Sequence, residues 1–159
     1  MKHSLKTGFS FGITSGIITT LGLMVGLHSG THSKLSVLGG IFTIAIADAF
    51  SDALGIHVSE ESENMHSAKE IWQSTGSTFA AKFIIAITFA VPVLLLPLGE
   101  AMLAGVVYGM ALLAMLSFYI SNGGRRKSFG NVAEHLVIAL AVILIAHFAG
   151  EWIGLVFGG

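Results

Sequence analysis

The sequence of 159 residues contains no cysteine and few charged residues. Without cysteine, a disulfide framework and a thiolate metal site are both excluded. Charged residues make up 11% of the chain. Soluble domains carry about 25%, so this chain has too little polar surface to face water on every side. The formal net charge of −1 gives no reason to expect a nucleic-acid partner.

Hydrophobic residues make up 53% of the chain, and the mean hydropathy is +0.82. A helix needs about 20 mostly apolar residues to cross the hydrocarbon core of a bilayer. Five segments meet this requirement, at about residues 8–28, 35–56, 79–97, 100–121 and 131–157. We therefore predict an all-α integral membrane protein, with residues 1–159 forming a single five-helix domain in a lipid bilayer. The plasma membrane is expected for a prokaryotic protein, and an organelle membrane otherwise.

Polar residues separate some of these segments. Residues 57–78 form a polar insert between the second and third segments, and its centre, Glu60 to Gln73, is predicted to be a short amphipathic helix or a capped loop. A turn with a basic cluster at residues 122–128 separates the last two segments. Pro92 and Pro97 lack a backbone N–H donor, so they predict a kink or an early helix end in the third segment.

The positions of lysine and arginine predict the orientation, because cytoplasmic loops of membrane proteins carry an excess of both. With a cytoplasmic N-terminus, seven of the eight basic residues fall on the cytoplasmic side, namely Lys2, Lys6, Lys69, Lys82, Arg125, Arg126 and Lys127. Only Lys34 falls on the other side. The predicted topology therefore has the N-terminus inside and the C-terminal Gly159 outside.

Glycine recurs at helical spacing in the first segment, at Gly8, Gly12 and Gly16, and again at Gly22 and Gly26. Small residues four apart let two helix backbones approach closely in a bilayer. One interpretation is that glycine is simply common in membrane helices. The other is that the first segment packs closely on a second helix. We predict the latter, in the form of a homodimer through Gly8, Gly12 and Gly16.

Two acidic residues, Asp48 and Asp52, lie four apart on one face of the second segment. Asp48 is roughly 12 Å from the cytoplasmic end of this segment, at about 1.5 Å per residue. A carboxylate at such depth costs on the order of 3 kcal/mol, so it usually faces a cavity or a pathway. The alternative is a protonated aspartate that forms a hydrogen bond between helices.

Like charges this close together cannot all stay ionised without a cation or protons. We therefore predict that Asp48 and Asp52 bind a divalent metal cation in competition with protons. Thr14 and Ser15 lie at a similar depth in the first segment and could contribute hydroxyl oxygens to this site. Alternatively, these hydroxyl groups bond to the backbone of their own helix, as serine and threonine often do.

Other candidate metal ligands lie nearer the ends of the segments. Four follow the second segment, namely His57, Glu60, Glu61 and Glu63. They could gather divalent cations at a pore entrance, or they could form an ordinary solvated loop. Two secondary pairs lie in the last segment, namely Glu134 with His135 and His147 with Glu151. A histidine beside a carboxylate can bind a metal or relay protons, although Glu151, next to Trp152, could simply reach toward the interface.

The stretches Gly12 to Thr20 and Ala47 to Glu63, together with the order of five spans and a polar insert, resemble the vacuolar iron transporter family. This resemblance implies a homodimer that exports ferrous iron and related divalent ions from the cytosol in exchange for protons. It also implies an ion path between the first two helices at the dimer interface. Several positions depart from the family pattern, and the polar insert is shorter than in the family. Ser15 stands where family members carry an aspartate, and Asp52 where they carry a methionine.

Two functions of different classes follow. The first is proton-coupled export of a divalent cation such as Fe²⁺ or Mn²⁺, with Asp48, Asp52, Thr14 and Ser15 along the ion path. The second is a membrane sensor or assembly module that keeps the fold without transport, and the loss of the family aspartate at Ser15 favours it. No nucleophile–base arrangement stands out, so we predict neither an enzyme nor a bound cofactor.

Overall fold

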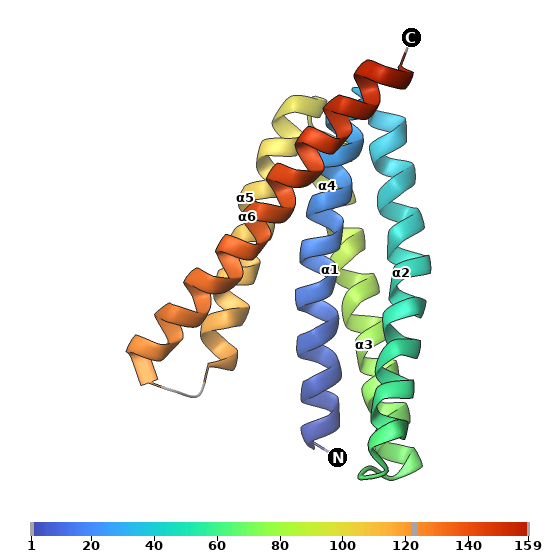
Figure 1. The fold of residues 1–159 in the computed structure, drawn as a ribbon, viewed down its shortest axis with the longest axis vertical. Coiled ribbons are helices and arrows are strands. Elements are labelled where there is room, and N and C mark those ends of the chain that lie inside the picture. The colour runs from blue at the N-terminus through green and yellow to red at the C-terminus, as the bar shows by residue number, and fades with distance from the viewer. Residues whose placement is uncertain (1, 122–123, 159) are drawn as a thin grey trace.

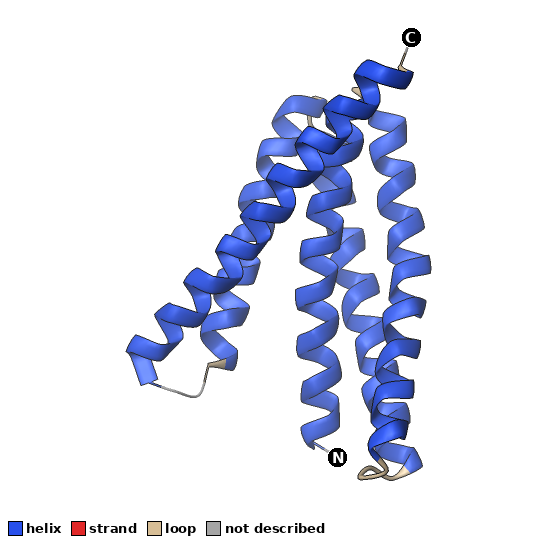
Figure 2. Cartoon of the chain, viewed as in Figure 1, coloured by secondary structure: helices blue, strands red, loops and turns tan. Residues whose placement is uncertain are grey.

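The structure, a computed structural model, describes residues 2–121 and 124–158, with no side chains described at residues 2, 3 and 124–128. The described part is helical and contains no strand (Figure 2). Its helices are α1 (Lys2–Thr31), α2 (Lys34–Glu63), α3 (Ala68–Thr88), α4 (Ala90–Leu95), α5 (Leu98–Ile120) and α6 (Gly124–Phe157). The turn predicted at residues 122–128 is wrong for residues 124–128, because α6 already begins at Gly124. Residues 122–123, the side chains of Arg125, Arg126 and Lys127, and Gly159 lie outside the described residues.

The all-α prediction with five membrane-length helices is confirmed for the described residues. Helices long and apolar enough to cross a membrane cover Ser4–Thr31, Lys34–Glu63, Ala68–Leu95, Leu98–Ile120 and Phe129–Phe157. The third of these combines α3 and α4. The described chain begins and ends at opposite ends of the molecule, as an odd number of crossings requires (Figure 1).

Helix α1 is the centre of the fold and contacts α2, α3, α5 and α6. In Figure 1, α1, α2 and α3 run side by side. Helices α5 and α6 lie close to them at the end of the molecule that carries the C-terminus and diverge from them toward the other end. The buried apolar core joins α1 to its neighbours and includes Ile17, Leu21, Met24, Val37, Ile41, Phe89, Val93 and Leu113. The three helices side by side position the polar cluster described below.

The expected polar insert at residues 57–78 is not a separate element. Helix α2 continues to Glu63 and α3 begins at Ala68, so only residues 64–67 connect them. Glutamate is a good helix former, so the acidic residues extend α2 rather than end it. Asn64 ends α2 in the left-handed conformation, with φ 53°, and Ser67 and Glu70 form a capping box that starts α3.

The prolines act as predicted. Helix α3 ends at Thr88, four residues before Pro92, because proline offers no N–H to the Thr88 carbonyl. The short helix α4 ends at Leu95, and Pro97 precedes the first residue of α5. The third span is therefore broken into two helices.

The glycine face of α1 packs closely on a second helix, but that helix belongs to the same chain. A Cβ atom at Gly8 would lie 2.3 Å from the Ser74 carbonyl oxygen, and one at Gly12 would lie 2.5 Å from the Thr78 carbonyl oxygen. Thr78 also donates a hydrogen bond of 3.2 Å to the Gly8 carbonyl oxygen. Because α3 fills this face, Gly8, Gly12 and Gly16 are not open to a second copy in this structure, and the homodimer itself stays a prediction.

Candidate cation-binding site

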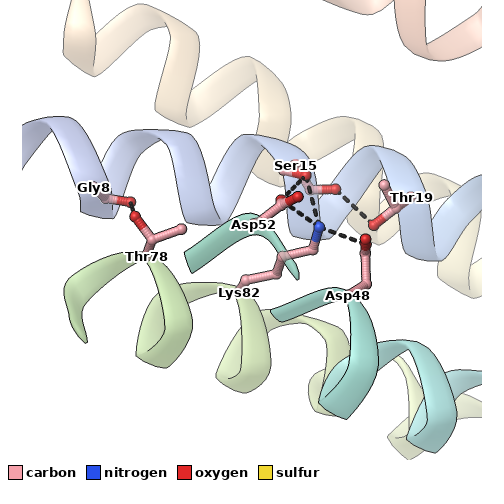
Figure 3. A network of polar contacts seen from close by, with 7 residues as sticks. All are labelled: Gly8, Ser15, Thr19, Asp48, Asp52, Thr78 and Lys82. Carbon is pink, nitrogen blue, oxygen red and sulfur yellow. Dashed lines mark hydrogen bonds and ion pairs between the residues drawn. The ribbon is translucent and has the colours of Figure 1, made fainter. Parts of the chain in front are cut away.

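Lys82 of α3 lies at the point where α1, α2 and α3 meet, and its side chain is 1% exposed. Its Nζ atom lies 2.5 Å from Asp48 Oδ2 and also forms an ion pair with Asp52 Oδ2 (Figure 3). Nζ donates a hydrogen bond of 2.9 Å to Ser15 Oγ, and Ser15 Oγ donates one of 2.6 Å to Asp52 Oδ2. We call these four side chains the Asp–Lys cluster.

The two carboxylates hold the ammonium group in different ways. Asp52 accepts a directed hydrogen bond from Lys82 as well as forming the ion pair. The Asp48 oxygen is close to the ammonium but lacks the direction of a hydrogen bond. Asp48 therefore contributes mainly charge, whereas Asp52 and Ser15 fix the position of the ammonium group.

Small residues on α1 and α2 allow this cluster to form. Ala45, Ala49 and Ala53 form a buried stripe along α2, close in sequence to the two aspartates. On α1, a Cβ atom at Gly16 would lie 3.3 Å from the Lys82 carbonyl oxygen. Since these residues add little bulk, the three backbones come close enough for Lys82 to reach both neighbouring helices.

Two carboxylates and one ammonium group leave the Asp–Lys cluster with a formal charge of −1. The spacing of Asp48 and Asp52 predicted a bound cation, and Lys82 supplies part of that positive charge. The two aspartates are not sealed in, because their side chains are 28% and 19% exposed. The cluster therefore combines a buried positive group with carboxylates that remain accessible from the surface of α2.

Lys82 was not predicted as a site residue, because the charge pattern along the chain placed it among the cytoplasmic charges. The structure places Lys82 in the buried interior of the third span. One signal was available, since Lys82 is a lone basic residue inside the apolar stretch 79–97. In the structure it follows Thr78 by four residues and lies in the buried stripe of α3. A lone lysine at such a position indicates a buried partner of opposite charge.

The structure separates the two predicted hydroxyl ligands on α1. Ser15 is part of the Asp–Lys cluster. Thr14 instead donates a hydrogen bond of 2.9 Å to the carbonyl oxygen of Ser10, so its hydroxyl group is satisfied within its own helix, as the alternative interpretation expected.

The candidates at the end of α2 do not join the cluster. Glu61 and Glu63 are exposed, whereas Glu60 is 7% exposed. The Nδ1 atom of His57 lies 3.0 Å from Thr75 Oγ1, and the His57 ring contacts the Trp72 ring at 4.7 Å between centroids. His57 thus lines an apolar pocket of about 440 Å³ between α2 and α3, away from the carboxylates.

The secondary candidates lie in two separate parts of α6. His135 Nδ1 lies 2.7 Å from Ser117 Oγ of α5, and the neighbouring Glu134 is exposed. Further along, His147 Nδ1 lies 2.6 Å from Ser29 Oγ of α1, and its Nε2 lies 3.8 Å from Glu151 Oε1. These hydrogen bonds join α6 to α5 and to α1, and neither pair approaches the Asp–Lys cluster in the contacts of the described residues.

Among residues 2–121 and 124–158, no three histidine, aspartate or glutamate side chains converge closely enough to hold a metal ion. The Asp–Lys cluster brings together three of the twelve predicted ligands, namely Asp48, Asp52 and Ser15. No protein-family model, curated protein or solved structure matches this chain.

Proposed function

We propose that this protein transports a cation across a membrane and that Asp48 and Asp52 bind the cation on its way. The observation that carries this proposal is the pair of carboxylates within a membrane-length helix, one helical turn apart, around a positive group and still partly exposed. Ionisable groups within a span are costly and usually mark an ion pathway. Ser15 supports the site by holding Asp52.

The same cluster also supports the second candidate, a membrane module without transport. Lys82 compensates one of the two negative charges, so the Asp–Lys cluster could serve only to join α1, α2 and α3. Partial exposure of both aspartates favours transport, because a cation can reach carboxylates that are open to the surroundings.

Orientation and assembly also belong to the proposal. Without Lys82, six of the seven remaining basic residues still favour a cytoplasmic N-terminus, which is the orientation that we propose. The resemblance to the vacuolar iron transporter family implies divalent export, proton coupling and a homodimer. A homodimer would need a surface other than the Gly8, Gly12 and Gly16 face, because α3 covers that face.

Flux through liposomes that contain the purified protein tests this proposal. Na⁺, K⁺, Mn²⁺ and Fe²⁺ would be offered separately, with empty liposomes as the background. We expect the wild type to carry at least one of them and Asp52→Asn to lower that flux by about tenfold or more, because one carboxylate of the site is lost. Glu63→Gln removes an exposed carboxylate from the same helix and serves as the matched control.

Flux of every ion at the empty-liposome level would remove the transport proposal and favour the structural module. The same conclusion would follow if a folded Asp52→Asn variant carried the ion as fast as the wild type.

A further inference from the structure

Lys82 is one of the largest fully buried side chains of the described residues, and its ammonium group is surrounded by oxygen atoms. These are Asp48 Oδ2, Asp52 Oδ2 and Ser15 Oγ, from two helices other than its own. Two N–H groups of Lys82 Nζ donate hydrogen bonds, to Asp52 Oδ2 and Ser15 Oγ, and Asp48 Oδ2 adds an ion pair. The lysine is therefore built into the site and is not a mobile surface charge.

The carboxylates keep one oxygen each for a further ligand. Both aspartates belong to α2, and each contacts Lys82 Nζ through its Oδ2 atom (Figure 3). Within the part of the chain that the structure describes, Oδ1 of Asp48 and Oδ1 of Asp52 take part in no hydrogen bond. A cation that arrives from the exposed side can thus bind these oxygens while the ammonium group stays in place.

The charge of the cluster then decides which cation fits. With Lys82 in place, the cluster carries −1, so one singly charged cation makes it neutral and a divalent cation leaves it at +1. Net charge is costly in the low dielectric of a membrane protein interior, so the neutral sum with a monovalent cation is favoured over the charge of +1 with a divalent one.

We propose that Lys82 is a specificity-determining residue, which makes this site selective for a monovalent cation such as Na⁺ or K⁺. This inference rests on the proposed transport function and names its substrate class. It replaces the divalent ion that the family resemblance implies. The departure of Ser15 from the family aspartate agrees with it, since a third carboxylate would restore the charge that a divalent ion needs.

Calorimetric titration of the purified wild type, Lys82→Gln and Lys82→Arg with Na⁺, K⁺ and Mn²⁺ tests the inference. We expect the wild type to bind Na⁺ or K⁺ in preference to Mn²⁺. Lys82→Gln leaves the site at −2, so the affinity for Mn²⁺ relative to the monovalent ion should rise by about tenfold or more. Lys82→Arg keeps the positive charge and should keep the wild-type preference.

A wild type that binds Mn²⁺ in preference to both monovalent ions would overturn the inference and leave cation transport standing. An unchanged ratio of affinities in a folded Lys82→Gln variant would also overturn it. If Lys82→Gln does not fold, the preference of the wild type for monovalent ions or for Mn²⁺ tests the inference by itself. A wild type that binds none of the three ions would remove the proposed function together with this inference.

Discussion

The double variant Asp48→Asn/Asp52→Asn is expected to be less stable than the wild type by about 3–5 kcal/mol, because it leaves a buried charge without a partner. Lys82 is 1% exposed, and the two aspartates supply the only negative charges that the described structure places beside it. Asparagine keeps the shape and offers an acceptor oxygen, but it cannot compensate the ammonium charge. The free energy of unfolding, measured in detergent with a chemical denaturant, reports this loss.

Adding Lys82→Met to the double aspartate variant should recover most of the lost stability. Methionine is about as long as lysine, so it fills the same space without a charge. The matched control is Glu61→Gln/Glu63→Gln, which removes the same number of charges from the exposed end of α2 and should change stability by less than about 1 kcal/mol. If the double aspartate variant is as stable as this control, these aspartates do not hold Lys82.

A second large effect is expected where α6 crosses α1. A Cβ atom at Gly150 would lie 2.2 Å from the Gly26 carbonyl oxygen and 3.1 Å from Ser29 Cβ. Backbone cannot give way as a flexible side chain can, so Gly150→Ala must push the two helices apart, at a cost of about 3 kcal/mol. The separation should also weaken the hydrogen bond between Ser29 and His147 at this crossing.

The control for this change is Gly39→Ala, since nothing lies within 4 Å of a Cβ atom there. Alanine in an open helical position is favoured over glycine by about 0.5–1 kcal/mol, so this variant should be as stable as the wild type or slightly more stable. Thermal unfolding of both variants in the same detergent provides the comparison. Equal stabilities would mean that α6 does not cross α1 at Gly150.

Local patterns in the sequence predicted much of the fold. Apolar length alone indicated the five long helices, and the spacing of Asp48 and Asp52 correctly placed both carboxylates on one side of α2. Helix ends were less predictable. The charges after residue 56 suggested an insert, but Glu60 to Glu63 favour helix and simply extend α2.

Contacts between distant helices could not be read from local patterns. The spacing of Gly8, Gly12 and Gly16 indicated a close helix contact, but a spacing does not specify the partner, which is α3 of the same chain. The same limit explains why Lys82 was missed as the partner of Asp48 and Asp52. Two aspartates four apart suggest mutual repulsion and a stabilising effect of Asp52→Asn. Because the ammonium group of Lys82 lies between them, we expect Asp52→Asn to lower the stability of the fold instead.

Crystallographic anomalous scattering from Tl⁺, a heavy monovalent cation, tests most directly whether Asp48 and Asp52 form the cation site. Crystals grown with Tl⁺ should show an anomalous peak beside Oδ1 of both aspartates, with Lys82 Nζ still on their Oδ2 atoms. The same crystals of the Asp48→Asn/Asp52→Asn/Lys82→Met variant should lack this peak. A peak at the acidic end of α2 or beside His147, with none at Asp48 and Asp52, would contradict the account.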